Sequence, residues 1–333
     1  MSINIAINGF GRIGRLAFRQ IINTEGYRIA AINDLTSPKM LAHLLKYDTT
    51  QGHYNKAISY NENSLIVAGA AIPIYAQKDP SQLPWKELQI DVVLECTGFF
   101  ASKSAATAHI NAGARKVLIS TTAGKDVPTI VYGINEHTLT KEDTIVSAAS
   151  CTTNCLAPMA YFLNELAPVK KGFMTTIHAY TNDQNTLDGP HAKDDLRRAR
   201  SAAGNIIPTT TGAAKAIGQV IPALDGKLDG TSQRVPVMAG SLTELTAVVG
   251  GSVTVEQVNQ KMEQSQSEQY GYTEEPIVSS DIIGMNYGGL FDATQTKVSE
   301  LGRDTLVKIA AWYDNENSFT SQMIRTAKYL AEL

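Results

Sequence analysis

A glycine-rich stretch that follows the first apolar run constrains the fold of this chain more than any other feature. Residues 8–15 read Asn-Gly-Phe-Gly-Arg-Ile-Gly-Arg, which contains the pattern Gly-x-Gly-x-x-Gly. The stretch follows a strand expected at 3–7 and begins a helix, and a second strand then ends at Asp34, twenty residues after Gly14. The glycine pattern alone is weakly specific. Strand, helix and acidic residue in this order predict the first βαβ unit of a dinucleotide-binding domain.

The three glycines have a physical role in such a unit. Gly9, Gly11 and Gly14 would let the backbone approach a pyrophosphate, and the N–H groups at the start of the helix would bind its charge. Asp34 is expected to accept hydrogen bonds from a ribose 2′-hydroxyl and to repel a 2′-phosphate, which favours NAD over NADP. The alternative is a glycine-rich turn that only allows tight strand–helix packing. The combination of the strand, the helix and the acidic residue Asp34 disfavours this alternative.

The first half of the chain alternates short apolar runs with helical patterns. Strands are expected at 3–7, 29–32, 92–94, 117–119 and 144–146, and helices at 15–23 and 103–112. This alternation predicts the α/β class, with a Rossmann-type, doubly wound parallel sheet. Three further strands at 58–60, 65–67 and 72–75, separated by turns, predict a small antiparallel insert.

The second half of the chain differs from the first, because longer strands are expected there. Strands are expected at 173–180, 241–249, 291–299 and 305–313, and helices at 151–165, 211–220 and 255–268. They predict an α+β catalytic domain with a mainly antiparallel sheet. We therefore expect a dinucleotide-binding domain at 1–150, joined by an amphipathic C-terminal helix at 318–333, and a catalytic domain at 151–317. The polar stretch 181–205 is expected to be a functional loop.

Charge and cysteine content restrict the class of protein. The net charge of −3 is too small to indicate a nucleic-acid partner or a polybasic membrane contact. Three cysteines in 333 residues argue against a disulfide framework and for a reducing compartment. The sequence starts without a signal peptide and has no apolar run long enough to span a bilayer, so a cytoplasmic location is expected.

Cys151 is the candidate nucleophile. The sequence Ser150-Cys-Thr-Thr-Asn-Cys155 follows an expected strand and begins an expected helix. The backbone N–H groups at a helix start stabilise a thiolate, so the pKa of Cys151 is expected to be lowered. Pro158 indicates that this helix is irregular near its start. A metal role for Cys151 and Cys155 is disfavoured, because zinc needs further ligands at suitable spacing and none are nearby.

His178 and Cys96 have less specific sequence signals. His178 lies near the end of the strand at 173–180, and a histidine is the natural base for a cysteine nucleophile. The sequence alone does not bring His178 to Cys151, and a single histidine in a strand is more often structural. Cys96 follows an apolar strand, and its better interpretation is a small buried hydrophobic residue.

Motifs along the chain resemble the phosphorylating, NAD-dependent glyceraldehyde-3-phosphate dehydrogenases of bacteria. They cover essentially the whole chain in the order of that family, and together they are highly specific. The matching stretches are 8–15, Asn33-Asp-Leu35, Leu44-Leu-Lys-Tyr-Asp48, Glu95-Cys-Thr-Gly98, Ser150-Cys-Thr-Thr-Asn154, Ile177-His-Ala-Tyr-Thr181, Asp195-Leu-Arg-Arg-Ala-Arg200, Pro208–Lys215, Gln233-Arg-Val-Pro236, Ser279-Ser-Asp281 and Trp312-Tyr-Asp-Asn-Glu316.

The resemblance implies a reaction through sulfur. The residue that matches Cys151 attacks the aldehyde of D-glyceraldehyde 3-phosphate to form a thiohemiacetal, and the residue that matches His178 takes the proton. Hydride transfer to NAD leaves a thioester, which inorganic phosphate cleaves to 1,3-bisphosphoglycerate. Covalent capture of this kind divides one difficult step into easier ones.

The same resemblance implies two anion sites. Thr181 and Arg234 would hold the phosphate of the substrate. The attacking phosphate would be held by Ser150, Thr152, Thr211 and Gly212. Without the resemblance, the threonines would be interpreted as helix caps and Arg234 as part of a surface ion pair.

The resemblance also assigns cofactor contacts and an assembly. The residues that would contact NAD are Gly9, Gly11, Arg12, Ile13, Gly14, Asp34, Lys78, Ser120 and Asn315. Pro190 matches a loop position associated with NAD preference, and the family implies a homotetramer with loop 181–205 at subunit interfaces. The sequence departs from the family at Phe319, which lacks the usual tyrosine hydroxyl. It also departs at Lys78, where arginine is common, and at Thr121-Thr122, which replace Ala-Pro.

Three other functions remain to be compared with this one. An erythrose-4-phosphate dehydrogenase shares the fold and the Cys–His pair, although Ala179-Tyr-Thr181 and Pro190 favour the triose enzyme. A binding protein that keeps only the fold would be expected to lack the nucleophile or to carry a basic surface. An NADP-dependent biosynthetic form disagrees with Asp34. We also expect little disulfide between Cys151 and Cys155, since an i,i+4 pair in a helix needs backbone distortion to form one.

Overall fold

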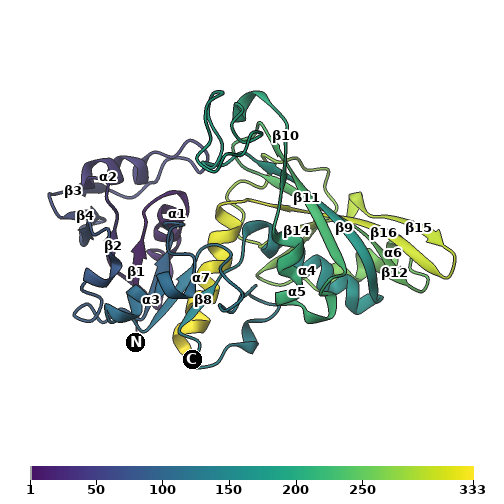
Figure 1. Ribbon diagram of the computed structural model, residues 1–333, viewed down its shortest axis with the longest axis horizontal. Coiled ribbons are helices and arrows are strands. Elements are labelled where there is room, and N and C mark those ends of the chain that lie inside the picture. The colour runs from purple at the N-terminus through teal and green to yellow at the C-terminus, as the bar shows by residue number, and fades with distance from the viewer. Residues whose placement is uncertain (1) are drawn as a thin grey trace. The chain divides into compact units, whose positions relative to one another are not determined.

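The computed structural model describes residues 2–333, and the chain divides into two compact units (Figure 1). Unit 1 comprises the chain up to Ala149 together with Thr320–Leu333, and unit 2 comprises Ser150–Phe319. Unit 1 is therefore made of two segments that lie at opposite ends of the sequence.

Unit 1 is built on an eight-stranded sheet whose order is β3-β4-β5-β2-β1-β6-β7-β8. The strands are β1 (Ile3–Asn8), β2 (Tyr27–Asn33), β3 (Ile58–Tyr60), β4 (Ser64–Val67), β5 (Ala70–Tyr75), β6 (Val92–Glu95), β7 (Lys116–Ile119) and β8 (Ile145–Ser147). Neighbours from β5 to β8 pair in parallel, whereas β3, β4 and β5 pair antiparallel. The doubly wound sheet and the antiparallel insert are thus both confirmed.

The order of strands around β1 places a topological switch at the glycine motif. The chain moves outward from β1 to β2 on one side and later to β6 and β7 on the other. In doubly wound sheets, ligands bind at the carboxyl ends of the strands where this reversal occurs. Gly9 comes directly after β1, so the motif lies at that point.

Four helices contribute to unit 1. They are α1 (Arg12–Ile21), α2 (Pro38–Lys46), α3 (Lys103–Asn111) and the larger part of α7 (Asn317–Glu332). Helix α1 begins at Arg12, three residues before the predicted start, and α2 was not predicted. The first two turns of α7 are buried on nearly all sides, so the expected amphipathic pattern fails there.

Unit 2 contains a second sheet, ordered β10-β11-β9-β12-β16-β14-β13, with β15 paired to β16. The strands are β9 (Val169–Ala179), β10 (Ile207–Thr210), β11 (Leu228–Val235), β12 (Ser241–Gly250), β13 (Tyr270–Thr273), β14 (Gly289–Asp292), β15 (Lys297–Leu301) and β16 (Asp304–Tyr313). Most pairs are antiparallel, and β9–β11 and β13–β14 are parallel. The mainly antiparallel sheet is therefore confirmed, although β10, β11 and β13 were not predicted.

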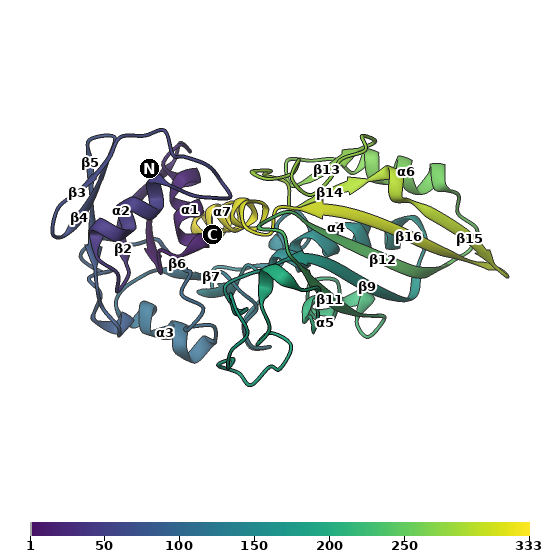
Figure 2. The same cartoon turned by 90° about the horizontal axis from the view of Figure 1, so that it is seen from above.

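One predicted strand of unit 2 is wrong. The run 291–299 was expected to be continuous, but a short 3-10 helix at Ala293–Gln295 separates β14 from β15. The Asp292 side chain caps this turn by accepting the N–H of Thr294 at 3.0 Å. The hairpin of β15 and β16, in yellow in Figure 2, turns near Gly302 as expected.

Three helices pack on the sheet of unit 2, with α4 against β9, β12, β14 and β16. They are α4 (Cys151–Leu166), α5 (Ala213–Val220) and α6 (Val255–Gln264). Helix α4 is continuous through Pro158, so the predicted irregularity at its start is not observed. Helix α5 begins two residues later than predicted, and α6 ends four residues earlier. Residues 181–201 contain no helix or strand.

Within residues 2–333, no helix is both long and apolar enough to cross a membrane.

Candidate active site

The turn between β8 and α4 places Cys151 in the first position of the helix. Ser150 is the N-cap, and its hydroxyl oxygen accepts the N–H of Thr153 at 3.1 Å. Ala149, one residue earlier, has a φ of 61°, a left-handed conformation that is uncommon for residues other than glycine. Backbone strain of this kind is concentrated at functional sites. The fold therefore presents this thiol on a strained turn.

His178, near the end of β9, lies beside the thiol. Its Nε2 atom is 3.4 Å from Cys151 Sγ. The side chain is 4% exposed, and its ring packs edge-on against Tyr313 with 5.8 Å between the centroids. A sulfur nucleophile and an imidazole at this separation can exchange a proton directly.

Burial controls the protonation of this pair. It raises the pKa of the Cys151 thiol, while Arg234 and contacts with Thr152 lower that pKa by less. The expectation that the helix start lowers the pKa of Cys151 is therefore wrong, because the cost of desolvating a thiolate outweighs Arg234 and the hydrogen bonds from the first turn of the helix. Burial, together with Arg234, lowers the pKa of His178 to about 3. At neutral pH the pair is thus a neutral thiol beside a neutral imidazole.

The other nitrogen of His178 has two competing partners. Its Nδ1 atom is 2.7 Å from the carbonyl oxygen of Ala179 and also 2.7 Å from Nη1 of Arg234. If Nδ1 carries the proton it donates to the carbonyl, and Nε2 is then free to accept the thiol proton. If Nδ1 is unprotonated it accepts from Arg234, and Nε2 carries the proton. These two contacts alone do not hold His178 in one tautomer.

Tyr313 is a member of this site that the sequence did not single out. Its hydroxyl is 2.9 Å from Thr152 Oγ1 and 2.6 Å from Thr176 Oγ1. The tyrosine is fully buried, so these contacts link the first turn of α4 to β9 beneath the Cys–His pair. Thr152, predicted to bind phosphate, therefore turns its hydroxyl toward the interior.

Thr181 and Arg234 belong to a cluster of charged groups at the end of β9. The Thr181 hydroxyl donates to Asp183, and Arg198 forms an ion pair with the same carboxylate. Arg234 Nη2 lies 3.9 Å from Asp183 Oδ2. Burial alone would raise the pKa of Asp183, but Thr181, Arg234 and Arg198 lower it. Arg198 also pairs with Asp195 at 3.4 Å, so two arginines and two carboxylates meet in this region.

Asp183 and Arg198 were missed as candidates. Both lie in the polar stretch 181–205, and Arg198 also belongs to the matching stretch Asp195-Leu-Arg-Arg-Ala-Arg200, which was given no role in the site. Arg198 also donates to Thr209 Oγ1 at 3.2 and 3.1 Å, so it connects the loop to β10.

The remaining predicted phosphate ligands are arranged around helix starts. Gly212 is the N-cap of α5, and a Cβ at this position would meet no atom within 4 Å. The Thr211 hydroxyl accepts the N–H of Ala213 at 3.2 Å, which is a capping role. The Ser150 hydroxyl lies 2.7 Å from Thr153 Oγ1. Gly212 therefore leaves open space at the start of α5.

Unit 1 has a cavity of about 510 Å³ at the glycine motif. Gly9, Gly11, Asp34 and Lys78 line it, so it gathers four of the predicted cofactor residues. A Cβ on Gly11 would meet nothing within 4 Å, whereas one on Gly14 would lie 2.1 Å from the carbonyl oxygen of Gly9. Gly11 thus keeps the cavity open, and Gly14 allows α1 to pack against the loop. This division matches what a pyrophosphate-binding turn requires.

Asp34 organises the glycine loop as well as lining the cavity. Its Oδ2 accepts the N–H of Phe10 at 2.7 Å, and its Oδ1 accepts the N–H of Thr36 at 2.9 Å. Each carboxylate oxygen has a second lone pair that a ribose hydroxyl can use.

The other predicted cofactor residues are placed less directly. The Arg12 guanidinium forms an ion pair with Asp48, and Ile13 is partly exposed in the first turn of α1. Ser120 follows β7, and its N–H donates to the carbonyl of Glu95 at 3.0 Å. Asn315 is buried in unit 2, where its Oδ1 accepts from the Ser241 hydroxyl at 3.2 Å.

Cys96 is not the buried hydrophobic residue that the sequence indicated. It is partly exposed and lines the cavity together with Thr97 and Phe99. Strand β6 ends one residue earlier, at Glu95, so Cys96 lies at the carboxyl edge of the sheet where the cavity opens. Desolvation and the charge of Glu95 nevertheless raise the pKa of its thiol.

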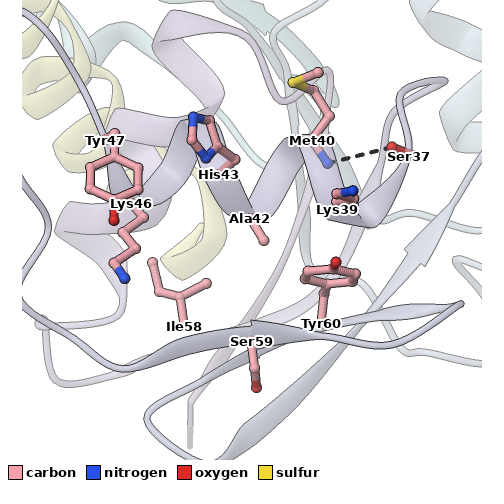
Figure 3. Close-up of a pocket in the computed structure, with 10 residues that line it drawn as sticks. All are labelled: Ser37, Lys39, Met40, Ala42, His43, Lys46, Tyr47, Ile58, Ser59 and Tyr60. Carbon is pink, nitrogen blue, oxygen red and sulfur yellow. Dashed lines mark hydrogen bonds between the residues drawn. The ribbon is translucent and has the colours of Figure 1, made fainter.

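A second cavity of unit 1, about 600 Å³, lies between α2 and β3 and contains none of the predicted site residues. Figure 3 shows Ala42 and Lys46 of α2 facing Ile58 and Tyr60 of β3. Among residues 2–333, no group of three or more His, Cys, Asp or Glu side chains is arranged to hold a metal ion.

Comparison with protein families gives two matches that together cover most of the chain. Residues 3–103 match the family described as glyceraldehyde 3-phosphate dehydrogenase, NAD binding domain. Residues 150–315 match the corresponding C-terminal domain.

Full-length relatives agree with these matches. The chain is 60% identical to a glyceraldehyde-3-phosphate dehydrogenase of Clostridium acetobutylicum over 329 residues, which cover 99% of this chain and 98% of the relative. It is 58% identical to the enzyme of the same name from Clostridium pasteurianum, with the same coverage. It is 54% identical to that of Streptococcus pyogenes, over 100% of this chain and 99% of the relative.

Proposed function

The chain belongs to the glyceraldehyde-3-phosphate dehydrogenase family, and we propose that it acts through a thioester on Cys151. The reaction is the oxidation and phosphorylation of D-glyceraldehyde 3-phosphate to 1,3-bisphosphoglycerate, with reduction of NAD. The observation that carries the role of Cys151 is the 3.4 Å separation of its sulfur from His178 Nε2. Cys151 is the nucleophile in this proposal, and His178 is the base.

The neutral state of the pair determines the first step. As Cys151 Sγ bonds to the aldehyde carbon, the thiol proton passes through His178 Nε2 to the carbonyl oxygen, which becomes the hydroxyl of a thiohemiacetal. This transfer needs the tautomer in which Nδ1 donates to Ala179 O. His178 Nε2, neutral again, takes that hydroxyl proton as the hydride leaves the carbon, and the thioester forms. Attack by inorganic phosphate on the thioester carbon breaks the C–S bond and releases the acyl phosphate, and the proton on His178 returns to the Cys151 sulfur.

NAD is the cofactor, and bound NAD supplies the hydride acceptor. The cavity at Gly9, Gly11 and Asp34 fits a dinucleotide, because its glycine loop is open where a pyrophosphate must approach. We propose that the N–H groups of Arg12, Ile13 and Gly14 face the phosphates, with Asp34 at the adenosine ribose. Lys78, Ser120 and Asn315 complete the proposed contacts, the last at the nicotinamide amide.

Two groups of residues are proposed to hold the anions. Thr181 and Arg234, beside Asp183 and Arg198, would bind the phosphate of the substrate. Ser150, Thr152, Thr211 and Gly212 would hold the attacking phosphate. Thr152 would contribute its backbone N–H, since its hydroxyl contacts Tyr313. Guanidinium groups bind phosphate through paired hydrogen bonds, and helix starts bind it through N–H groups.

A homotetramer in the cytoplasm is also part of the proposal, with unit 1 as the NAD-binding domain and unit 2 as the catalytic domain. Leu187 and Leu196, in the loop 181–205, are 76% and 80% exposed, and Phe173 of β9 is 73% exposed. These exposed apolar side chains are available for burial at a subunit interface. Light scattering on the purified protein is expected to give four chains per particle, and a monomer would contradict this assembly.

The experiment that tests the function follows NADH formation with glyceraldehyde 3-phosphate and NAD, with and without inorganic phosphate. Wild type is expected to require phosphate, and Cys151→Ser is expected to be inactive because a serine hydroxyl is a far weaker nucleophile at neutral pH. Equal NADH formation without phosphate would mean that water is the acceptor and that the second anion site is wrong. Faster turnover of erythrose 4-phosphate would contradict the triose substrate, and preference for NADP would contradict the role of Asp34.

A further inference from the structure

A buried polar network lies under the glycine loop of unit 1, and no step of the proposed mechanism uses it. It joins the carboxyl ends of β1, β2 and β6 to α3 and to the loop before β6. Its side chains are almost inaccessible to solvent: Asn8 is 1% exposed, Asn33 5%, Glu95 1%, His109 0% and Trp85 0%. Buried polar groups are costly unless every one is paired, so the direction of each hydrogen bond matters.

One end of the network is fixed by a tryptophan. Trp85 Nε1 donates to Nδ1 of His109 at 3.0 Å. An indole N–H can only donate, so Nδ1 of His109 must carry a lone pair. The proton of the imidazole is therefore on Nε2, which lies 3.1 Å from Glu95 Oε2 and donates to it. His109 is thus held as one neutral tautomer.

The other end is fixed by the backbone. The N–H of Gln77 donates to Asn33 Oδ1 at 2.9 Å, so the amide nitrogen of Asn33 must face Asn8, where it donates to Oδ1 at 2.7 Å. The amide nitrogen of Asn8 consequently points to Glu95 and donates to Oε2. Two obligatory donors, one at each end, therefore direct the amide of Asn8 and the imidazole of His109 toward Glu95, and the 3.3 Å separation of Asn8 Nδ2 from His109 Nε2 brings two donors together at one oxygen.

Glu95 is the common acceptor. Besides His109 and Asn8 on Oε2, it receives the backbone N–H of Thr97 at 2.8 Å and the Thr97 hydroxyl on Oε1. The backbone N–H of Thr97, His109 Nε2 and Asn8 Nδ2 donate to Glu95, and the Thr97 hydroxyl can donate as well. An ionised carboxylate accepts all four contacts.

The network reaches the cavity through Thr97 and Asn8. A Cβ on Gly9 would lie 2.8 Å from the backbone nitrogen of Thr97 and 2.9 Å from the carbonyl carbon of Cys96, so the glycine loop rests directly on this segment. Asn8, Asn33, Gln77, Cys96 and Thr97 all line the cavity. Moving Thr97 would therefore move the surface that supports Gly9.

We propose that Glu95 is a positioning residue for the dinucleotide, holding Thr97 against Gly9 while Trp85, through His109, keeps all donors directed at its carboxylate. The network sets the affinity of the cavity for NAD and leaves the chemical step on Cys151 unchanged. This inference rests on the NAD site proposed above.

The test compares two substitutions of one residue. In His109→Leu the volume is roughly kept and both hydrogen bonds are lost, whereas in His109→Gln an amide nitrogen can still donate to Glu95 and an amide oxygen can accept from Trp85. We expect the Kd for NAD, measured by titration calorimetry on the full chain, to rise about tenfold in His109→Leu. His109→Gln is expected to stay within about threefold of wild type. The KM for NAD should follow the Kd, while kcat at saturating NAD stays within about twofold.

Two further variants separate positioning from stability. Val67→Ala removes methyl groups from a fully buried position in β4, so it should lower the melting temperature without changing the Kd for NAD. Trp85→Phe keeps a buried ring and removes one N–H, so it should weaken NAD binding even if His109→Leu does not fold.

Three outcomes would overturn the inference. The first is a Kd for NAD within twofold of wild type in both His109→Leu and Trp85→Phe, which would mean that the network only supports the fold. The second is equal weakening by His109→Leu and His109→Gln, which would mean that hydrogen bonding is not the cause. The third is absence of NAD binding by wild type, which would overturn the proposed function as well.

Discussion

The two units each contain a buried histidine, and the contrast between them shows what distinguishes a reactive residue from a structural one. His109 is 0% exposed and His178 is 4% exposed, so burial does not separate them. In each histidine, Nε2 faces an acidic partner, which is the Glu95 carboxylate for His109 and the Cys151 thiol for His178. The difference lies in the partners of the other ring nitrogen, Nδ1. For His109 that nitrogen meets an indole N–H, which can only donate. For His178 it meets both a carbonyl oxygen and a guanidinium.

A ring nitrogen whose partner can only donate, or can only accept, has a single possible protonation state. A ring nitrogen that contacts both kinds of partner can be either protonated or unprotonated. His109 therefore holds its proton in one place and serves as a fixed link. His178 can place its proton on either nitrogen, which is what a group that takes and returns a proton must do.

The largest expected effect is the loss of turnover in His178→Asn. Without the imidazole, the Cys151 thiol has no base at 3.4 Å, and we expect kcat to fall by about a thousandfold. His109→Gln, in the other unit, should leave kcat nearly unchanged. Steady-state rates of the two variants at saturating substrates give the comparison. A loss of less than tenfold in His178→Asn would contradict the role of His178 as base.

An intermediate effect is expected from Arg234→Gln. This change removes a phosphate-binding guanidinium, so kcat/KM for glyceraldehyde 3-phosphate should fall about a hundredfold. It also removes the charge that helps to lower the pKa of His178, so turnover of unphosphorylated glyceraldehyde should be retained or increased. The ratio of the two rates is the measurement. Equal losses on both aldehydes would show that Arg234 does not recognise the phosphate.

The smallest expected effect concerns stability at low pH. The pKa of His178 is lowered to about 3 in the folded chain, below its value of about 6.5 in an unfolded one, so the unfolded state binds a proton first as the pH falls. The contribution of His178 to the stability of the folded chain is constant above pH 6.5 and becomes increasingly unfavourable between pH 6.5 and about 3. At pH 5 this costs about 2 kcal/mol.

His178→Asn should remove that dependence. Urea unfolding of unit 2, followed by the fluorescence of Trp312, would be compared at pH 7.5 and pH 5 for wild type and variant. A parallel fall in stability for both proteins would show that His178 is protonated in the folded state at pH 5.

The sequence predicted the parallel sheet of unit 1 well because its signals are local. Short apolar runs separated by helical patterns determine β1, β2, β6 and β7 without knowledge of the rest of the chain. The glycine motif around Gly9 can likewise be identified from the strand before it and the helix after it. The family resemblance then supplied His178, which no local pattern distinguishes from His109.

The missed features depend on distant partners. Strands β10 and β11 pair with each other and with β9, and their polar residues show no alternation that identifies a strand. The pKa of Cys151 was misjudged because helix position is visible in the sequence and burial is not. The interpretation of Cys96 failed for a related reason, since the residue belongs to an apolar run but lies where the sheet edge opens to a cavity. Asp183 and Tyr313 act through contacts with residues far away in the sequence.

The discontinuous composition of unit 1 has a consequence for the synthesis of the chain. Helix α7 adds residues made after unit 2 to the unit that is made first, and there Tyr27 donates to the carbonyl of Ile324 at 3.0 Å. A ribosome that has completed residues 1–149 has therefore delivered only part of the first unit, which must wait for the whole of unit 2 before its final helix emerges. Nascent chains in which residues 320–333 have not yet emerged are thus expected to expose the surface that binds α7, which makes that surface a natural target for chaperones.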